Sequence, residues 1–327
     1  MIQALQGWLP TAATASGLML LVPAALLPTH RAQGALLVLA LLLASGFLQL
    51  CWLGDALAYG LPLAVPASVL VATSLLERGR FYGLLLVGTA AGALGLYILE
   101  RLLGWWMPVL SPLALLPLAL VMALVTGLLG GMHLSLHPRR VRDGAALWHL
   151  APQGLVLTGW LLLTGGLAGV AEQMHPGAIG ISQLAAMLVG GFMSLLQAQG
   201  AGSGDGLQKA GEGMAAGLLI SLLAPASPMA GAALGLVAAF CVARGEALAL
   251  ALRLADAHRF TGALLLPAML GLLVPGLMHA AQLAPQLAWL GAALGSAAML
   301  ALLLWPLAML ICGVALPARL VREGVQR

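Results

Sequence analysis

The chain has 327 residues, of which 62% are hydrophobic and only 7% are charged, and its mean hydropathy is +1.05. Soluble domains usually carry about 25% charged residues, and a folded surface in water needs polar cover, so this composition excludes a soluble globular protein. The formal net charge of +4 does not indicate nucleic-acid binding, because the basic residues lie scattered between apolar runs and form no cluster interleaved with aromatic residues.

Apolar runs that could form membrane-spanning helices follow one another along the whole chain. A hydrocarbon core of about 30 Å takes about 20 helical residues. The sequence predicts eleven spans, at roughly 11–28, 35–53, 60–76, 82–99, 108–131, 153–171, 178–198, 211–224, 228–247, 260–280 and 286–317. The N-terminal stretch lacks a basic region, so we expect no cleavable signal peptide. The Gly-rich stretch 198–213 is interpreted as a flexible linker between the seventh and eighth spans.

The positions of the basic residues test this span count independently, because cytoplasmic loops collect Lys and Arg. Only Arg101 follows an even-numbered span. The other basic residues all follow odd-numbered spans: Arg31, Arg78, Arg80, Arg139, Arg140, Arg142, Lys209, Arg244, Arg253, Arg259, Arg319, Arg322 and Arg327. The pattern predicts an odd number of spans in the cell inner (plasma) membrane, with the N-terminus outside and the basic C-terminus in the cytoplasm.

Several stretches in chain order resemble the Amt/Mep/Rh ammonium transporter family. They include GLMLLVPAALLPTHRAQGALL in the first span, LCWLGDALAYG at the end of the second and SLLERGRFYGLLL at 74–86. Further along, GLVLTGWLLLTGG at 154–166, GEGMAAGLLISLLAPASPMAGAALGLVA at 211–238 and FTGALLLPAMLGLL at 260–273 resemble family helices. Each motif alone is weak, but together they run in register from residue 11 to residue 323.

The resemblance implies an architecture and an assembly. We expect an all-α integral membrane protein in which residues 1–327 form one domain of about eleven helices. Two inverted repeats, at about 11–131 and 153–280, would surround a central pathway, and a final helix at about 286–317 would pack across the outside. The resemblance also implies a homotrimer in the lipid bilayer with one pore in each subunit.

The pore chemistry of the family does not carry over to the aligned positions. The two gating Phe residues of the family fall at Leu63 and Leu163, an Asn falls at Thr164 and a vestibule Ser falls at Leu167. The twin pore His residues fall at Met122 or Ala123 and at Pro267. A lining of Leu and Met would make a dry constriction that disfavours ions. Pro267 in mid-helix would remove one backbone hydrogen bond and kink the helix.

A few polar and aromatic residues are candidates for an outer vestibule: Trp105, Trp106 and Glu100. Interfacial Trp residues more often anchor spans, and such a carboxylate more often belongs to a solvated ion pair. Glu172 and His175 share an outer loop, but two candidate ligands alone do not make a metal site. We expect no cofactor, no metal and no enzymatic constellation.

The sequence leaves two functions open. The first is passive permeation of ammonia or a similar small solute through a hydrophobic pore within each subunit. The second is a non-conducting relative of the ammonium transporters that acts as a structural, sensory or assembly subunit, alone or with other membrane subunits.

Overall fold

The computed structural model describes residues 2–24, 35–41, 43–44, 85–91, 124, 153–174, 176–252 and 261–313, and the regular elements within them are all helices. The named helices are α1 (Ile2–Ala24), α7 (Gln153–Met174), α8 (Ile181–Gly200), α9 (Gly206–Ser221), α10 (Pro228–Ala251), the π-helical η5 (Thr261–Leu265), α11 (Leu266–Met278) and α12 (Ala280–Gly313). Shorter helical pieces lie at 35–41, 43–44 and 85–91.

Five segments of the described part are long and apolar enough to cross a membrane: Gln153–Gln173, Ile181–Gly200, Pro228–Gly245, Thr261–Met278 and Ala280–Leu307. They coincide with the predicted runs at 153–171, 178–198, 228–247, 260–280 and 286–317, which confirms the all-α membrane class. The predicted runs at 60–76 and 108–131 lie outside the described residues, apart from residue 124, and those at 35–53 and 82–99 are described only in part. The count of eleven spans, its division into repeats and the single domain therefore stay predictions.

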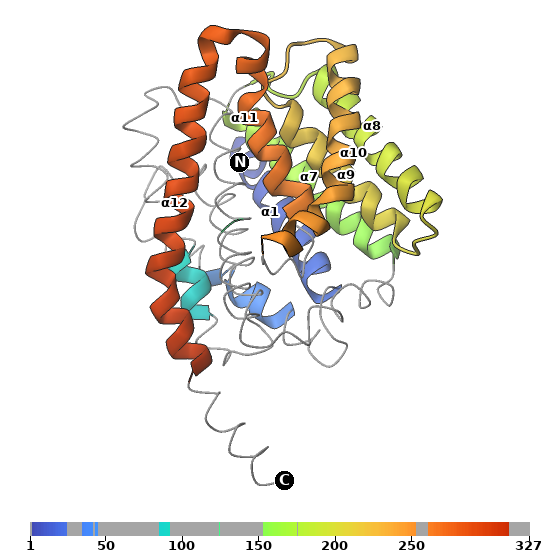
Figure 1. Cartoon of the computed structure of the whole chain (residues 1–327). Helices are drawn as coiled ribbons and strands as arrows, with labels where there is room; N and C mark the ends of the chain where they lie inside the picture. Colours follow the sequence, from blue (N-terminus) through green and yellow to red (C-terminus); the bar gives the residue numbers. More distant parts are fainter. Residues whose placement is uncertain are drawn as a thin grey trace.

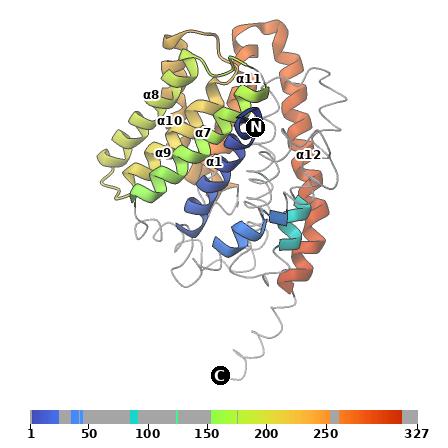
Figure 2. The same ribbon diagram turned by 180° about the vertical axis from the view of Figure 1, so that it is seen from behind.

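Some of the helix contacts join consecutive helices, and others join helices that are distant in the sequence. Helix α8 lies against both α9 and α10, α1 lies against α7, and α11 folds back on α12. In Figures 1 and 2 the long helix α12 stands on the side of the bundle opposite α8 and α10. Helices α7 and α9 are in mutual contact and lie inside this frame, so their side chains form much of the interior.

Small residues bring the backbones of α8, α9 and α10 close together. A Cβ atom on Gly190 of α8 would lie 2.5 Å from the carbonyl oxygen of Gly213 on α9. On α10, a Cβ at Gly231 would collide with the Ser182 carbonyl of α8. Close backbone approach at Gly is the usual way in which membrane helices gain van der Waals contact, because the lipid supplies no hydrophobic force between them.

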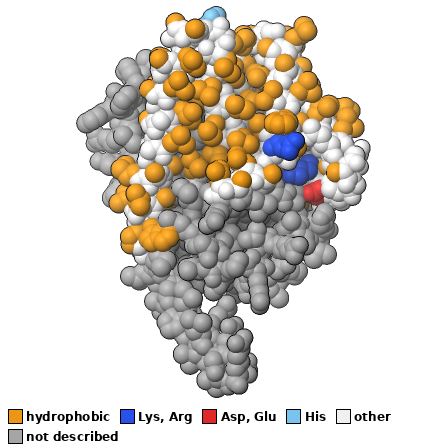
Figure 3. Space-filling view, viewed as in Figure 1, with side chains coloured by type: hydrophobic (Ala, Val, Ile, Leu, Met, Phe, Trp, Pro, Cys, Tyr) orange, Lys and Arg blue, Asp and Glu red, His pale blue; other side chains and the backbone are white. Residues whose placement is uncertain are grey.

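One face of the described part is covered by large apolar side chains. On α8 the exposed residues Ile181, Leu184, Leu188 and Phe192 follow the helical repeat along one side. Figure 3 shows such a face, with hydrophobic side chains over most of the described surface and the few charged ones gathered near one edge. A continuous apolar surface of this kind suits contact with lipid tails, so it agrees with the membrane class.

The prediction of a flexible linker at 198–213 is wrong for most of that stretch. Helix α8 continues to Gly200, α9 begins at Gly206, and only residues 201–205 between them are not helical. The start of α9 is supported by side-chain bonds from Gln208 and Lys209 to Glu212, at the i,i+4 and i,i+3 spacings that stabilise helices.

Candidate functional site

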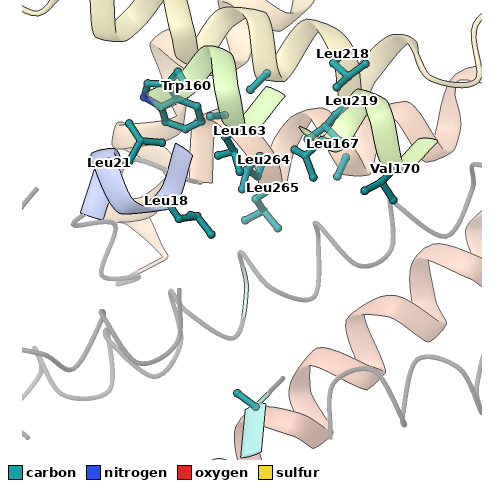
Figure 4. Close-up of a cluster of buried hydrophobic side chains, with 14 of the residues drawn as sticks. Leu18, Leu21, Trp160, Leu163, Leu167, Val170, Leu218, Leu219, Leu264 and Leu265 are labelled. Atoms are coloured by element: carbon teal, nitrogen blue, oxygen red, sulfur yellow. The ribbon is translucent and has the colours of Figure 1, made fainter. Parts of the chain in front are cut away.

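Aliphatic side chains from four elements fill the interior next to α7. Leu163 and Leu167 of α7 are only 3% and 7% exposed, and they pack in one buried cluster with residues of α1, α9 and η5. Figure 4 shows Leu163 beside Leu264 and Leu265 of η5. We name this group the leucine cluster: Leu18, Leu21, Leu163, Leu167, Leu218, Leu219, Leu264 and Leu265.

The leucine cluster brings together two of the residues that the sequence aligned with the family's pathway. Leu163, at a gating Phe position, and Leu167, at a vestibule Ser position, lie one helical turn apart on the same face of α7. The lining at this point is therefore apolar, as expected. Such a lining offers a hydrated ion no partner to replace its water shell.

Thr164 adds one polar group next to this apolar surface. The side chain is 1% exposed, and its hydroxyl has no hydrogen-bond partner among the described residues. Thr158 on the same helix instead donates to the Gly154 carbonyl at 2.8 Å, which is the usual bond of a helical Thr. A buried hydroxyl without a partner costs about 1–3 kcal/mol and calls for an explanation such as a bound water or solute.

Pro267 is buried at the point where η5 passes into α11. Its ring nitrogen carries no hydrogen, so it cannot donate the backbone bond that an α-helix would make there. The residues Thr261–Leu265, which end two positions before Pro267, form a π-helix, and such widened turns are frequent at functional sites. Pro267 thus lies in the first turn of α11, and the π-helix before it carries Leu264 and Leu265 of the leucine cluster. The kink expected at Pro267 stays a prediction.

Other predicted site residues lie outside the described part of the chain. These are Leu63, Met122 and Ala123 of the expected lining and Glu100, Trp105 and Trp106 of the expected outer vestibule. The neighbouring Leu124 is described, is helical and packs against the larger buried cluster to which the leucine cluster belongs.

A cavity of about 300 Å³ opens between α1 and α7 and shares no residue with the leucine cluster. Its walls are mostly apolar, with a carboxylate and an amide on one side: Leu9, Pro10, Ala13, Gly165, Gly169, Glu172 and Gln173. The Glu172 carboxylate accepts hydrogen bonds from the backbone N–H groups of Gly177 and Ile179, at 2.7 and 3.1 Å. Glu172 therefore organises the loop after α7.

A polar group that the sequence did not single out lies at the start of α9. Gln208 is fully buried and Glu212 is 1% exposed, although both sit on a helix of a protein with very few charges. The spacing of Gln208, Lys209 and Glu212 could have indicated one polar helical face, but the Gly-rich composition around them favoured a linker instead. Within the described residues, no group of three or more His, Cys, Asp and Glu side chains is placed to hold a metal ion.

These features define a polytopic α-helical membrane protein with an aliphatic interior. No protein-family model matches the sequence, and no curated protein matches it either. Among solved structures the chain is similar to Mep2 of Candida albicans, at 16% identity and a TM-score of 0.60, over 91% of this chain and 82% of that chain. It is also similar to Mep2 of Saccharomyces cerevisiae, at 14% identity and a TM-score of 0.62, over 91% of this chain and 84% of that chain.

The likeness to Mep2 confirms the resemblance to the Amt/Mep ammonium transporters at the level of the fold. With identities of 14 to 16%, the likeness establishes the arrangement of the helices and not the chemistry of the pathway. The chain is therefore a multi-pass membrane protein with an ammonium-transporter-like fold, and the chemistry must be argued from the residues themselves.

Proposed function

We propose that this protein mediates passive permeation of ammonia, or of a similarly small uncharged solute, through a hydrophobic path within each subunit. The observation that carries the proposal is the Mep2-like fold over 91% of the chain. The leucine cluster supports the uncharged form of the solute, because an ion in this lining would lose its hydration without compensation.

In this proposal Leu163 and Leu167 form the constriction, with Leu63, Met122 and Ala123 completing its lining and Pro267 shaping its wall. Thr164 supplies a polar contact close to the constriction. Its hydroxyl can both donate to and accept from a small molecule such as ammonia, and its buried position without a partner supports that role. No proton relay is needed when the solute is uncharged throughout.

We further propose that the N-terminus is outside, the C-terminus is cytoplasmic, and the protein is a homotrimer in the plasma membrane with an outer vestibule at Trp105, Trp106 and Glu100. The orientation is supported by the alternation of the basic residues. Lys209 at the start of α9 and Arg244 near the end of α10 belong to the same end of the bundle, because α8 and α10 both run antiparallel to α9. The trimer is supported by the fold likeness.

One observation favours a second function, that of a non-conducting membrane subunit. Leu163 and Leu167 are almost fully buried, and the described cavity between α1 and α7 does not reach them. A path that stays closed by these side chains would leave the protein a structural, sensory or assembly role.

Permeation is tested in proteoliposomes that contain a pH-sensitive dye and are exposed to an ammonium or methylammonium gradient. The proposal expects faster alkalinisation than in empty vesicles, and a further increase for Leu163→Ala, because the truncation widens the constriction. Leu161→Ala on the same helix is the matched control, since Leu161 is 43% exposed, and it should leave the rate unchanged. Rates equal to those of empty vesicles for wild type and Leu163→Ala would refute permeation and favour the non-conducting function.

A further inference from the structure

The first two turns of α9 bring a carboxylate, an amide and an ammonium group together in the interior. Gln208 Nε2 donates a hydrogen bond of 2.7 Å to Glu212 Oε1, and Lys209 Nζ donates one of 3.0 Å to Glu212 Oε2. Gln208 is 0% exposed and Glu212 is 1% exposed, whereas the Lys209 side chain is 17% exposed. Only the lysine therefore reaches the surroundings.

The amide of Gln208 has a second polar atom that nothing in the described structure satisfies. Its Oε1 is buried and has no hydrogen-bond partner among the described residues. The orientation of the amide is fixed by its neighbour, because turning it over would place the oxygen against the Glu212 carboxylate and the two acceptors would repel. The unpartnered oxygen is thus held beside the carboxylate.

The two acceptors are close enough to share one ligand. The oxygen and nitrogen of an amide are about 2.2 Å apart, so Gln208 Oε1 lies within about 5 Å of Glu212 Oε1. A tetrahedral nitrogen whose N–H groups donate to both oxygens at about 2.8 Å bridges acceptors about 4.6 Å apart, which is inside that limit. The site therefore matches a small cation that carries at least two N–H groups.

The group that already neutralises the carboxylate shows which chemistry the site accepts. Lys209 Nζ is a primary ammonium on a flexible four-carbon chain, and it holds Glu212 Oε2 from the partly exposed side. A buried carboxylate needs such a partner, because its removal leaves an uncompensated charge in a medium of low polarity.

We propose that Glu212 and Gln208 form a binding site for ammonium and small primary alkylammonium ions, and that the ammonium group of Lys209 occupies this site when no ligand is bound. When the lysine side chain swings outward, a free ammonium ion neutralises Glu212 in its stead, and by donating to Glu212 Oε1 this ion also reaches Gln208 Oε1. The site goes beyond the proposed permeation, because a ligand can bind there whether or not the leucine cluster conducts.

The test is chemical rescue of a variant from which the tethered ammonium has been removed. Full-length Lys209→Ala is purified in detergent, and its thermal unfolding is followed by tryptophan fluorescence with added methylammonium chloride. We expect the Tm of this variant to fall by several degrees and to be largely restored by methylammonium in a saturable manner. Tetramethylammonium chloride and sodium chloride at equal ionic strength should not restore it, because neither cation has an N–H group.

Two matched variants locate the effect. Lys209→Ala combined with Glu212→Gln should lose the rescue, because the carboxylate is gone. Arg244→Ala removes an exposed cation 5.6 Å from the centroid of the Phe240 ring and should show no response that is specific to methylammonium. Rescue that persists without Glu212, rescue by all three salts alike, or no rescue at all would overturn the proposal.

Lys209→Met keeps most of the lysine stem and serves if the alanine variant does not fold. If neither variant can be purified without ligand, the yield of folded protein in the presence of each salt tests the proposal instead. The proposal then expects folded protein when methylammonium is present throughout and none when tetramethylammonium replaces it, and equal yields in the two salts would refute it. The readout is binding and stability, so its failure is distinguishable from a failure of permeation in the vesicle assay.

Discussion

Replacing Gly213 by Ala tests whether the close contact between α8 and α9 holds the bundle together. A Cβ atom at this position would collide with the carbonyl oxygen of Gly190 and with the Ser194 hydroxyl. Ordinary C···O contacts between helices are about 3.3–3.6 Å, so the two helices would have to separate by roughly 1 Å. Strain of this kind costs about 1–3 kcal/mol in well-packed interiors.

A second Gly→Ala variant, at a position without a collision, corrects for the gain in helix propensity that any such substitution brings. Ala gains about 1 kcal/mol over Gly in a helix interior at either position. A Cβ at Gly295 of α12 would meet nothing within 4 Å, so Gly295→Ala has the gain without the collision. We expect Gly213→Ala to be less stable than Gly295→Ala by about 1–3 kcal/mol. Reversible unfolding in detergent with increasing SDS measures the difference, and equal stabilities would refute the role of this contact.

Two further substitutions test single hydrogen bonds. Gln286→Leu should lower the free energy of unfolding by about 1 kcal/mol, because Gln286 Oε1 accepts a hydrogen bond of 2.6 Å from the Gly276 N–H and so joins α12 to α11. The control Gln282→Leu, at an exposed position, should have no effect in the same SDS titration. Equal losses of stability in the two variants would contradict the role of this bond. Glu172→Gln should weaken the charge-assisted hydrogen bond of 2.7 Å that the Gly177 N–H donates to Glu172. The rate of amide hydrogen exchange in the loop after α7 should therefore rise several-fold. An unchanged exchange rate would show that Glu172 does not hold this loop.

Much of the fold could be predicted because the physical demands of a lipid bilayer are simple. A span must be apolar and about 20 residues long, so the run at 153–171 could be read directly and reappears as α7, Gln153–Met174. Helix α1 begins at Ile2, earlier than the run predicted at 11–28. Its first residues are less apolar than the rest, so the hydropathy pattern did not include them. Hydropathy marks the apolar part of a helix and does not reveal less apolar residues that extend the same helix.

The start of α9 shows why composition misled the prediction of a linker. Gly is the weakest helix former apart from Pro, so a Gly-rich stretch reads as flexible. In the fold these Gly residues are the points of contact, since a Cβ on Gly211 would press into Trp160 and one on Gly213 into Gly190. Tertiary packing overrides propensity here, and that packing cannot be seen until α7 and α8 are in place.

For the candidate site, the alignment with the family brought Leu163 and Leu167 forward, and the structure places both in one cluster. The same alignment brought Thr164 forward, but the hydrogen bonding and burial of the polar groups could not be predicted from it. Whether Thr164 finds a partner depends on the side chains around it, and a helical Thr usually bonds back to its own turn. The buried state of Glu212 likewise depends on the elements that pack around α9, which are α7, α8, α10, α11 and η5.

The fold and the pathway chemistry are under different constraints, and this explains how a Mep2-like fold can persist at 14–16% identity. Helix contacts require small residues at a few crossings, such as Gly213 against Gly190 and Gly245 against Gly262. An interior position such as Leu163 requires only an apolar side chain of suitable volume. A pathway can therefore change its polar groups while the bundle stays the same, so permeation has to be tested at a lining residue such as Leu163.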